Sequence, residues 1–197
     1  STIEHIIQLS PTMFESEHKE GKVTFSAGTA VNDCMKYCVK YGVSGLEFSA
    51  GVPATIGGMV TMNFGCWGVE VSDVLDSVQI LNENATILTL TKQDCHFAYR
   101  TSIFNQKKWI ILNATFNYEK KESATIKNLV HRYIKERLEK QPMRAKTFGS
   151  IFKNPKNNYA AKLIEDAGLK GYQMGDVLIS TQHANFMENS ASATYED

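Results

Sequence analysis

The glycine-rich stretch Ser49–Gly68 constrains the fold of this chain more than any other part of the sequence. It holds five glycines and one proline with small residues between them, which suits neither a strand nor a helix, yet it is too apolar for a solvent-exposed loop. Because glycine permits positive φ and lets a flat ligand approach main-chain N–H groups, the stretch predicts a cofactor site. A tight crossover packed against a sheet explains the same residues equally well, so both interpretations stay open.

The overall composition is that of an ordinary globular protein. The 197 residues are 43% hydrophobic and 21% charged, which is enough for one good core or two small ones. Lysine plus arginine and aspartate plus glutamate each number 21, so no net field attracts nucleic acid or an acidic membrane. We therefore expect neither of these partners, and any phosphate must be bound by local groups.

The four cysteines follow no zinc-ligand spacing and no disulfide framework, which favours a reducing compartment without a metal site. Two of them, Cys34 and Cys38, share one face of a predicted helix, where free thiols usually behave as small core residues. No apolar run approaches the length of a membrane span.

The pattern of the first part of the chain predicts an α+β domain over residues 1–119. Apolar residues at helical spacing predict a helix over Thr29–Tyr41, with Thr29 as the N-cap and Gly42 as the stop. Apolar and β-branched runs between turn residues predict strands at Ile3–Ser10, Lys22–Ser26, Val69–Leu81, Ala85–Leu90 and Trp109–Tyr118.

A polar hinge at residues 120–122 leads into a second, smaller α+β domain over residues 120–197. An amphipathic stripe predicts a helix over Ser123–Lys140, and a second helix is expected near Ala160–Ala167, closed by Gly168. Strands are predicted at Val177–Ser180 and Asn185–Glu188, and cap-like residues in Ser190–Asp197 predict the start of another helix.

Three residues outside the glycine-rich stretch suggest chemistry. Arg100 follows two aromatic residues in an apolar segment, and a buried arginine needs a planar acid, which is either a ligand anion or a structural carboxylate. Ser150 precedes a Lys-Asn-Pro turn, where a serine is usually a cap, and no Ser-His-Asp order marks a hydrolase. For His183 a hydrogen-bonded core histidine is the default explanation.

Taken together, these stretches resemble the flavin-dependent UDP-N-acetylenolpyruvoylglucosamine reductases (MurB family) of bacterial peptidoglycan synthesis. The matching pieces occur in the family's order along nearly the whole chain, and the ordered set is specific although each piece alone is weak. They are Gly28, Gly45-Leu46-Glu47, residues 53–58 and 63–68, Tyr99-Arg100-Thr101-Ser102, residues 149–155, residues 160–171 and residues 183–186.

The resemblance implies an FAD-binding α+β domain of the vanillyl-alcohol-oxidase/MurB type over residues 1–119, followed by a smaller α+β substrate-binding domain over residues 120–197. It implies an oxidoreductase in which NADPH reduces bound FAD and the flavin reduces UDP-N-acetylglucosamine enolpyruvate to UDP-N-acetylmuramate. We expect a cytoplasmic bacterial monomer that serves cell-wall synthesis, and thereby cell shape and division.

The resemblance also assigns roles to residues. Arg100 resembles the enol-stabilising residue of the family, and Ser150 resembles its proton donor. The expected substrate-binding residues are Tyr99, Lys140, Asn154, His183 and Asn185. The expected cofactor-binding residues are Val52, Pro53, Ala54, Thr55, Ile56, Gly57, Gly58, Asn63, Gly65 and Gly68.

Several features depart from the family pattern. Ala54 stands where glycine is usual, Cys66-Trp67 stands where Ala-Tyr is common, and the short interval between Arg100 and Ser150 resembles the compact branch that lacks a tyrosine-bearing substrate loop. The family's pyrophosphate loop and its catalytic glutamate fall outside these 197 residues, so we expect the polypeptide alone to bind FAD poorly.

Two other hypotheses stay open. One is a catalytically inactive homologue that binds nucleotides or UDP-sugars, although the presence of both Arg100 and Ser150 argues against it. The other is a different FAD-dependent oxidoreductase on the same scaffold, such as an oxidase that uses oxygen in place of NADPH.

Overall fold

The computed structural model describes residues 8–12, 16–194 and 196, and it divides into two compact units, residues 1–133 and 134–197. Each unit has its own antiparallel sheet. The functional domains expected at residues 1–119 and 120–197 stay a prediction, because the compactness of a unit does not show where a ligand binds. No helix among the described residues is long and apolar enough to cross a membrane.

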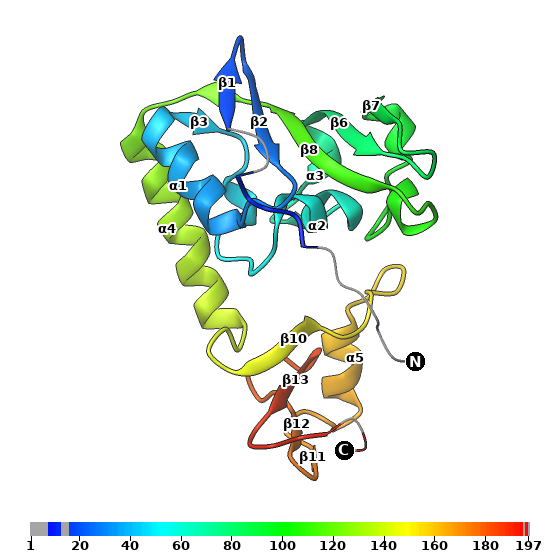
Figure 1. Ribbon diagram of the computed structural model, residues 1–197. Helices are drawn as coiled ribbons and strands as arrows, with labels where there is room; N and C mark the ends of the chain where they lie inside the picture. Colours follow the sequence, from blue (N-terminus) through cyan, green and yellow to red (C-terminus); the bar gives the residue numbers. More distant parts are fainter. Residues whose placement is uncertain (1–7, 13–15, 195, 197) are drawn as a thin grey trace. The chain divides into compact units, whose positions relative to one another are not determined.

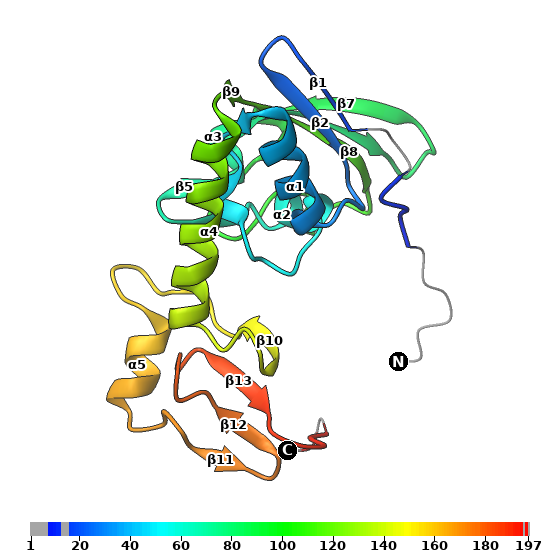
Figure 2. The same ribbon diagram turned by 90° about the vertical axis from the view of Figure 1, so that its left-hand side faces the viewer.

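Unit 1 is built on a five-stranded antiparallel sheet in the order β1-β2-β8-β6-β7. Helices α1 (Val31–Tyr41) and α2 (Ile56–Thr61) lie on the same side of this sheet (Figures 1 and 2). The central strands bury large side chains such as Phe25, Ile80 and Phe116, and the Phe25 ring meets Tyr37 of α1 edge-on. The strands are β1 (Glu17–Lys19), β2 (Lys22–Ser26), β6 (Leu75–Leu81), β7 (Ile87–Thr91) and β8 (Ile110–Asn117).

The start of unit 1 corrects two predictions. The strand expected at Ile3–Ser10 lies partly outside the described residues, and residues 8–10 are not in a strand; β2 instead pairs with β1. The N-cap of α1 is Ala30 and not Thr29, whose buried hydroxyl has no hydrogen-bond partner among the described residues. Gly42 ends α1 in the left-handed region at φ 68°, as predicted.

The glycine-rich stretch is more ordered than its composition predicts. It contains α2, whose N-cap Thr55 accepts a hydrogen bond from the Gly58 N–H at 3.3 Å. A small hairpin follows, in which β4 (Gly65–Cys66) pairs with β5 (Val69–Glu70). A local cap and close packing therefore overcome the weak helix propensity of two adjacent glycines.

The strand predicted over Val69–Leu81 is divided in the structure. Its first residues form β5 and the one-turn helix α3 (Val71–Val74), and only β6 enters the main sheet. The strand expected at Ala85–Leu90 appears as β7, which pairs with β6, and the strand expected at Trp109–Tyr118 appears as β8. Further short elements are β3 (Val43–Ser44), which pairs with β9 (Glu119–Lys120), and the 3-10 helices η1 (Glu47–Ser49), η2 (Gln93–Cys95) and η3 (Ile103–Asn105).

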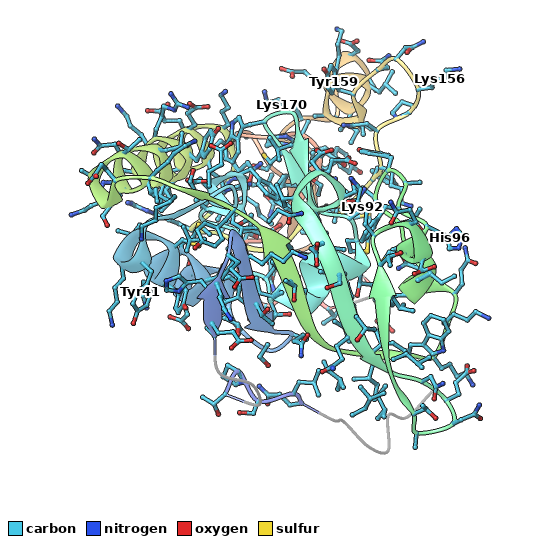
Figure 3. All side chains as sticks on the ribbon, turned by 90° about the horizontal axis from the view of Figure 1, so that it is seen from above. Tyr41, Lys92, His96, Lys156, Tyr159 and Lys170 are labelled. Carbon is cyan, nitrogen blue, oxygen red and sulfur yellow. The ribbon has the colours of Figure 1, made fainter. Side chains whose placement is uncertain are left out.

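An aromatic cluster joins the short strand β1 to α1. The Nδ1 atom of His18 lies 2.7 Å from the Tyr37 hydroxyl oxygen, and the His18 ring lies 5.1 Å from the Tyr41 ring. Tyr41 lies at the C-terminal end of α1 (Figure 3). Burial raises the pKa of Tyr37, so its hydroxyl stays protonated and can donate. The cluster thus covers an edge of the sheet.

Helix α4 (Ser123–Lys140) has the bounds that the sequence predicts, and it begins in unit 1 and ends in unit 2. Unit 2 holds a four-stranded antiparallel sheet in the order β10-β13-β12-β11, together with α5 (Ala160–Asp166). The helix expected to start in Ser190–Asp197 is not seen at residues 190–194, where Ser190 instead bonds to the Asp176 carbonyl oxygen. The strands are β10 (Lys146–Ser150), β11 (Gln173–Met174), β12 (Val177–Ile179) and β13 (Phe186–Asn189).

Gly57 packs α2 closely against the end of β2, and this contact gives a stability prediction. A Cβ atom at Gly57 would lie 3.0 Å from the Ala27 Cβ and 3.2 Å from its carbonyl oxygen, whereas one at Gly58 would meet nothing nearer than 3.5 Å. We expect Gly57→Ala to lower the free energy of unfolding by roughly 1–3 kcal/mol, the usual cost of overpacking. Gly58→Ala, the matched control, should be neutral or stabilising in the same urea titration. Equal stability of the two variants would contradict this packing account.

Candidate active site

The glycine loop, which we define as Val52–Gly68, has a buried side and an open side. Ile56, Met59 and Val60 are buried in the core of unit 1, as the crossover interpretation predicts. Pro53, Thr55 and Gly58 are exposed on the other side. The two interpretations of the sequence are therefore compatible, because one side packs under the sheet and the other is free to meet a ligand.

The N–H groups at the start of α2 are already used within the protein. Ile56 N donates to the Thr29 carbonyl oxygen at 3.0 Å, Gly57 N donates to the Ala27 carbonyl oxygen at 2.9 Å, and Gly58 N donates to Thr55 Oγ1. These three donors hold the loop in place. These N–H groups are therefore not free for a ligand, but a flat ligand can still come close to the main chain. At Gly68, for example, no atom lies within 4 Å of where a Cβ would be.

Arg100 lies in a tight turn, Ala98–Thr101, which we call the arginine turn. Ala98 and Thr101 exchange two main-chain hydrogen bonds of 3.1 Å, and Arg100 has a left-handed φ of 54°. The guanidinium donates from Nη2 to the Gly65 carbonyl oxygen at 2.7 Å and from Nη1 to the Asn63 carbonyl oxygen at 3.5 Å. An arginine held at a strained φ is typical of functional positions.

Arg100 is only half-buried, and its partners bear on the two explanations that the sequence left open. No ion pair joins it to a carboxylate of the described residues, so the structural ion pair is not seen there. Main-chain carbonyls bind the cation without neutralising it, and its charge remains available to an anionic ligand. The rings of Phe64 and Tyr99 lie 5.7 Å and 5.1 Å from its central carbon, and Tyr99 is 45% exposed.

Trp67 has a role that the sequence did not indicate. It takes a positive φ of 53° in the turn of the β4–β5 hairpin, and its ring stacks on Tyr133 of α4 with the ring centroids 4.1 Å apart. This stacking fixes the hairpin of the glycine loop to the part of α4 that belongs to unit 1. Trp67, which departs from the family pattern together with Cys66, thus makes a packing contact with α4.

Ser150 ends strand β10 directly after a β-bulge. The register slips by one residue between the pairs Thr147–Glu188 and Ser150–Phe186, and Gly149 within the bulge has φ 85°. The bulge leaves Phe148 98% exposed, and Ser150 is exposed too. Bulges are common beside active sites because they re-aim side chains, so this geometry suits a serine that meets a ligand.

The two asparagines expected to bind substrate make main-chain contacts in unit 2. The Asn185 amide accepts from Phe152 N at 3.0 Å and donates to the Phe152 carbonyl oxygen at 2.8 Å. Asn154 Oδ1 accepts from Ala160 N at 3.0 Å, at the start of α5. Both side chains therefore shape the segment that follows Ser150, and any substrate contact they make is additional.

His183 and Lys140 differ in how firmly they are held. His183 Nδ1 accepts from Asn185 N at 3.3 Å, and its ring packs edge-on against Phe186 with centroids 4.8 Å apart. This matches the core-histidine explanation and requires a neutral ring at Nδ1. Lys140 is exposed and lies 3.8 Å from Glu136, so its ammonium group can move to meet an anion.

The structure brings together only some of the predicted site residues. Arg100, Tyr99 and the glycine loop lie in unit 1, whereas Ser150, Asn154, His183 and Asn185 lie in unit 2. The predicted approach of Arg100 and Ser150 to one substrate therefore stays a prediction.

Besides Trp67, sequence reasoning missed Ser102, Glu70 and the cavities of unit 2. Ser102 is buried and donates to the Thr61 carbonyl oxygen at 2.6 Å, and Glu70 accepts from Asn63 Nδ2 at 2.8 Å. Ser102 ends the Tyr-Arg-Thr-Ser motif, which is the signal that could have pointed to it. Unit 2 also contains two cavities of about 430 Å³ each; the more apolar one is lined by Phe148, Val177 and Met187 among others.

Comparisons with known proteins show what the chain is similar to. The protein-family model described as UDP-N-acetylenolpyruvoylglucosamine reductase, C-terminal domain, matches residues 141–197. A second family model, described as FAD binding domain, matches residues 3–91. A UDP-N-acetylenolpyruvoylglucosamine reductase of Caldanaerobacter subterraneus subsp. tengcongensis is 40% identical over 176 residues, which are 89% of this chain and 58% of that protein. Residues 141–197 thus match the C-terminal domain of the UDP-N-acetylenolpyruvoylglucosamine reductases, and over 89% of its length the chain is similar to such a reductase.

Two further reductases of the same name show the same similarity. The reductase of Caldicellulosiruptor saccharolyticus is 40% identical over 181 residues, which are 91% of this chain and 58% of that protein. The crystal structure of the reductase from Thermus caldophilus superposes with a TM-score of 0.80 at 30% identity, over 88% of this chain and 64% of that one. The chain thus spans 58% of the length of both curated relatives. The predicted fold class, an FAD-binding domain followed by a smaller α+β domain, is confirmed.

His183 gives a pH prediction. Burial lowers the pKa of His183 below its ordinary 6.5 by penalising the charged ring. A group with a lowered folded pKa favours folding above its unfolded pKa and loses this contribution as the pH falls below it. We therefore expect the unfolding temperature to fall as the pH drops below about 6.5, and to fall less in His183→Asn, which keeps an acceptor near Nδ1 but does not titrate. Identical pH profiles of the two proteins by calorimetry would show that His183 is not held neutral.

Proposed function

We propose that the protein containing this chain reduces UDP-N-acetylglucosamine enolpyruvate to UDP-N-acetylmuramate with NADPH, through bound FAD. The similarity to these reductases supports this activity, and one observation in unit 1 carries it. The Arg100 guanidinium is fixed to the main chain of the glycine loop and is not neutralised by a carboxylate of the described residues. It is therefore a cation prepared for an anionic group beside a loop that suits a flat ring.

The glycine loop fits an FAD ring. Its outer side exposes Pro53, Thr55 and Gly58, and Gly68 leaves open space, so a flat group can lie against the main chain. The buried hydroxyl of Thr29, which has no partner among the described residues, precedes Ala30, and Ala30 pairs with Thr55 of the loop. When bound, FAD supplies a hydride that it has received from NADPH.

Arg100 would act on the carboxylate of the enolpyruvyl group. Addition of a hydride to the terminal carbon of the double bond leaves an electron pair on the carbon next to the carboxylate. A guanidinium beside that carboxylate stabilises the resulting enolate, and it costs little reorganisation because its position is already fixed by Gly65 and Asn63. We propose this role for Arg100, with Tyr99 beside it as a substrate contact.

Ser150 would supply the proton that completes the reduction. Its O–H would donate to the carbanionic carbon and recover a proton from solvent, so that the double bond gains one hydride and one proton. A serine is a weak acid, but an enolate carbon is a strong base, and the exposed position of Ser150 after the bulge leaves its hydroxyl accessible. Asn185 would hold this segment through Phe152.

We propose substrate-binding roles for the remaining predicted residues of unit 2. Lys140 is exposed, so its ammonium group can move to meet a phosphate. Asn154 follows Ser150 and accepts from Ala160 N, and His183 follows Ser180 and donates from its main-chain N–H to Ser180 Oγ. We further propose that the protein works as a cytoplasmic monomer in peptidoglycan-precursor synthesis, since NADPH and UDP-sugars are cytoplasmic metabolites. Through that pathway it would serve cell shape and division.

Substitution of either proposed catalytic residue should impair one of the two half-reactions and spare the other. In the protein expressed from its whole reading frame, NADPH should bleach the yellow flavin absorbance, and the enolpyruvyl sugar should restore it without oxygen. We expect Arg100→Lys and Ser150→Ala to retain the bleaching but to slow the restoration by about a hundred-fold or more, because both act on the substrate. Stopped-flow absorbance measures both steps.

Ser192→Ala is the matched control, since Ser192 is an exposed serine of the same unit with no assigned role. It should behave as the wild type in both steps. A wild-type protein that is bleached by NADPH but recoloured only by oxygen would be a different oxidoreductase, and one that is not bleached would be an inactive homologue. Normal restoration in Ser150→Ala would remove Ser150 from the mechanism.

A further inference from the structure

Asn63 occupies a backbone position that usually selects glycine. Helix α2 ends in a Schellman motif, in which Phe64 N donates to the Met59 carbonyl oxygen at 2.9 Å and Asn63 N donates to the Val60 carbonyl oxygen at 3.1 Å. Asn63 is the left-handed residue of this motif, with φ 41°. Glycine fills such positions without strain, so the asparagine is explained by what its side chain does.

The Asn63 side chain is buried and almost fully hydrogen-bonded. It is 1% exposed, and its Nδ2 donates to Glu70 Oε2 at 2.8 Å and to the Ala98 carbonyl oxygen at 3.3 Å. Its Oδ1 accepts from Ser72 N at 2.9 Å. One amide thus connects the end of α2 with β5, with the start of α3 and with the arginine turn, which is distant in the sequence.

Hydrogen bonds fasten the arginine turn and the residue after it to the glycine loop. The Ala98 carbonyl oxygen accepts from Asn63, and the Arg100 guanidinium donates to the carbonyl oxygens of Gly65 and Asn63. Directly after the turn, Ser102 Oγ donates to the Thr61 carbonyl oxygen. Ser102 is itself buried and begins η3. The Asn63 bond is the one that reaches the main chain of the turn just before Arg100, where the strained φ of 54° must be maintained.

We propose that Asn63 is a positioning residue for Arg100. Its amide holds the arginine turn in register with the glycine loop and so presets the direction of the guanidinium before a ligand arrives. This inference rests on the proposed function for its catalytic consequence, and it replaces the expected direct contact between the Asn63 side chain and the cofactor. Both Nδ2 hydrogens are engaged within unit 1, which leaves none for the flavin.

Two variants separate the effect of the Asn63 side chain from that of its left-handed backbone conformation. Asn63→Gly keeps the left-handed position without strain and removes every side-chain bond. Asn63→Asp keeps the acceptor for Ser72 N but places a carboxylate beside Glu70 and the Ala98 carbonyl oxygen. The matched control is Ala85→Gly, which replaces another left-handed residue, with φ 57°, in the exposed turn between β6 and β7.

The first measurement is amide hydrogen exchange of the whole protein, read by mass spectrometry on peptides that cover residues 97–102 and residues 110–117. We expect both Asn63 variants to exchange about ten-fold or more faster at Ala98 and Thr101 with unchanged protection of β8, because the side-chain bonds of Asn63 reach the arginine turn, Glu70 and Ser72 but not β8. Ala85→Gly should match the wild type at both peptides. Unchanged exchange at the turn, or an equal rise in β8, would overturn the inference.

The second measurement is the restoration of the flavin absorbance by the enolpyruvyl sugar. We expect both Asn63 variants to slow it by about ten-fold or more, and Ala85→Gly to leave it unchanged. Wild-type rates in both Asn63 variants would overturn the positioning role. If the wild-type protein itself does not reduce the sugar, the proposed function fails, and the exchange result alone decides whether Asn63 holds the arginine turn.

Discussion

The hydrogen bond from Arg100 Nη2 to the Gly65 carbonyl oxygen joins the two segments of unit 1 on which the proposed chemistry depends. It places a cation at the rim of a loop whose other side is built into the core. One side of the loop can stay open to a ligand because Ile56, Met59 and Val60 anchor the opposite side in the core. The N–H groups at the start of α2 are also satisfied, by Ala27, Thr29 and Thr55. Rigidity of this kind is what a preset electrostatic site requires.

Much of the fold follows from patterns that are local in the sequence. The bounds of β2 and α4 are those predicted, since an apolar run between turn residues and a long amphipathic stripe leave few alternatives. The stop at Gly42 follows from the conformational freedom of glycine. Helix α2 could not be predicted in this way, because its stability comes from the Thr55 cap and from close packing on Ala27 and not from propensity.

In the candidate site, the sequence could not show which partners the predicted asparagines bind. A family resemblance marks Asn63, Asn154 and Asn185 as important, but it does not show which partner each amide has. In the structure all three bind the main chain of the protein, at Ala98, Ala160 and Phe152 respectively. An amide carries both donors and acceptors, so the same residue can shape a loop or bind a ligand, and only the geometry distinguishes the two roles. The roles of Arg100 and Ser150 likewise come from the resemblance, since their residue types alone left a structural carboxylate partner and a cap as alternatives.

The central claim is that a flavin lies along Val52–Gly68 and that Arg100 and Ser150 meet one substrate beside it. The most direct measurement is a crystal structure of the whole protein with FAD and the enolpyruvyl sugar. The account predicts the ring against the open side of the glycine loop, the Arg100 guanidinium on the sugar's carboxylate, and the Ser150 hydroxyl next to the carbon that gains the proton. A flavin bound elsewhere, or Arg100 and Ser150 on separate surfaces, would contradict it.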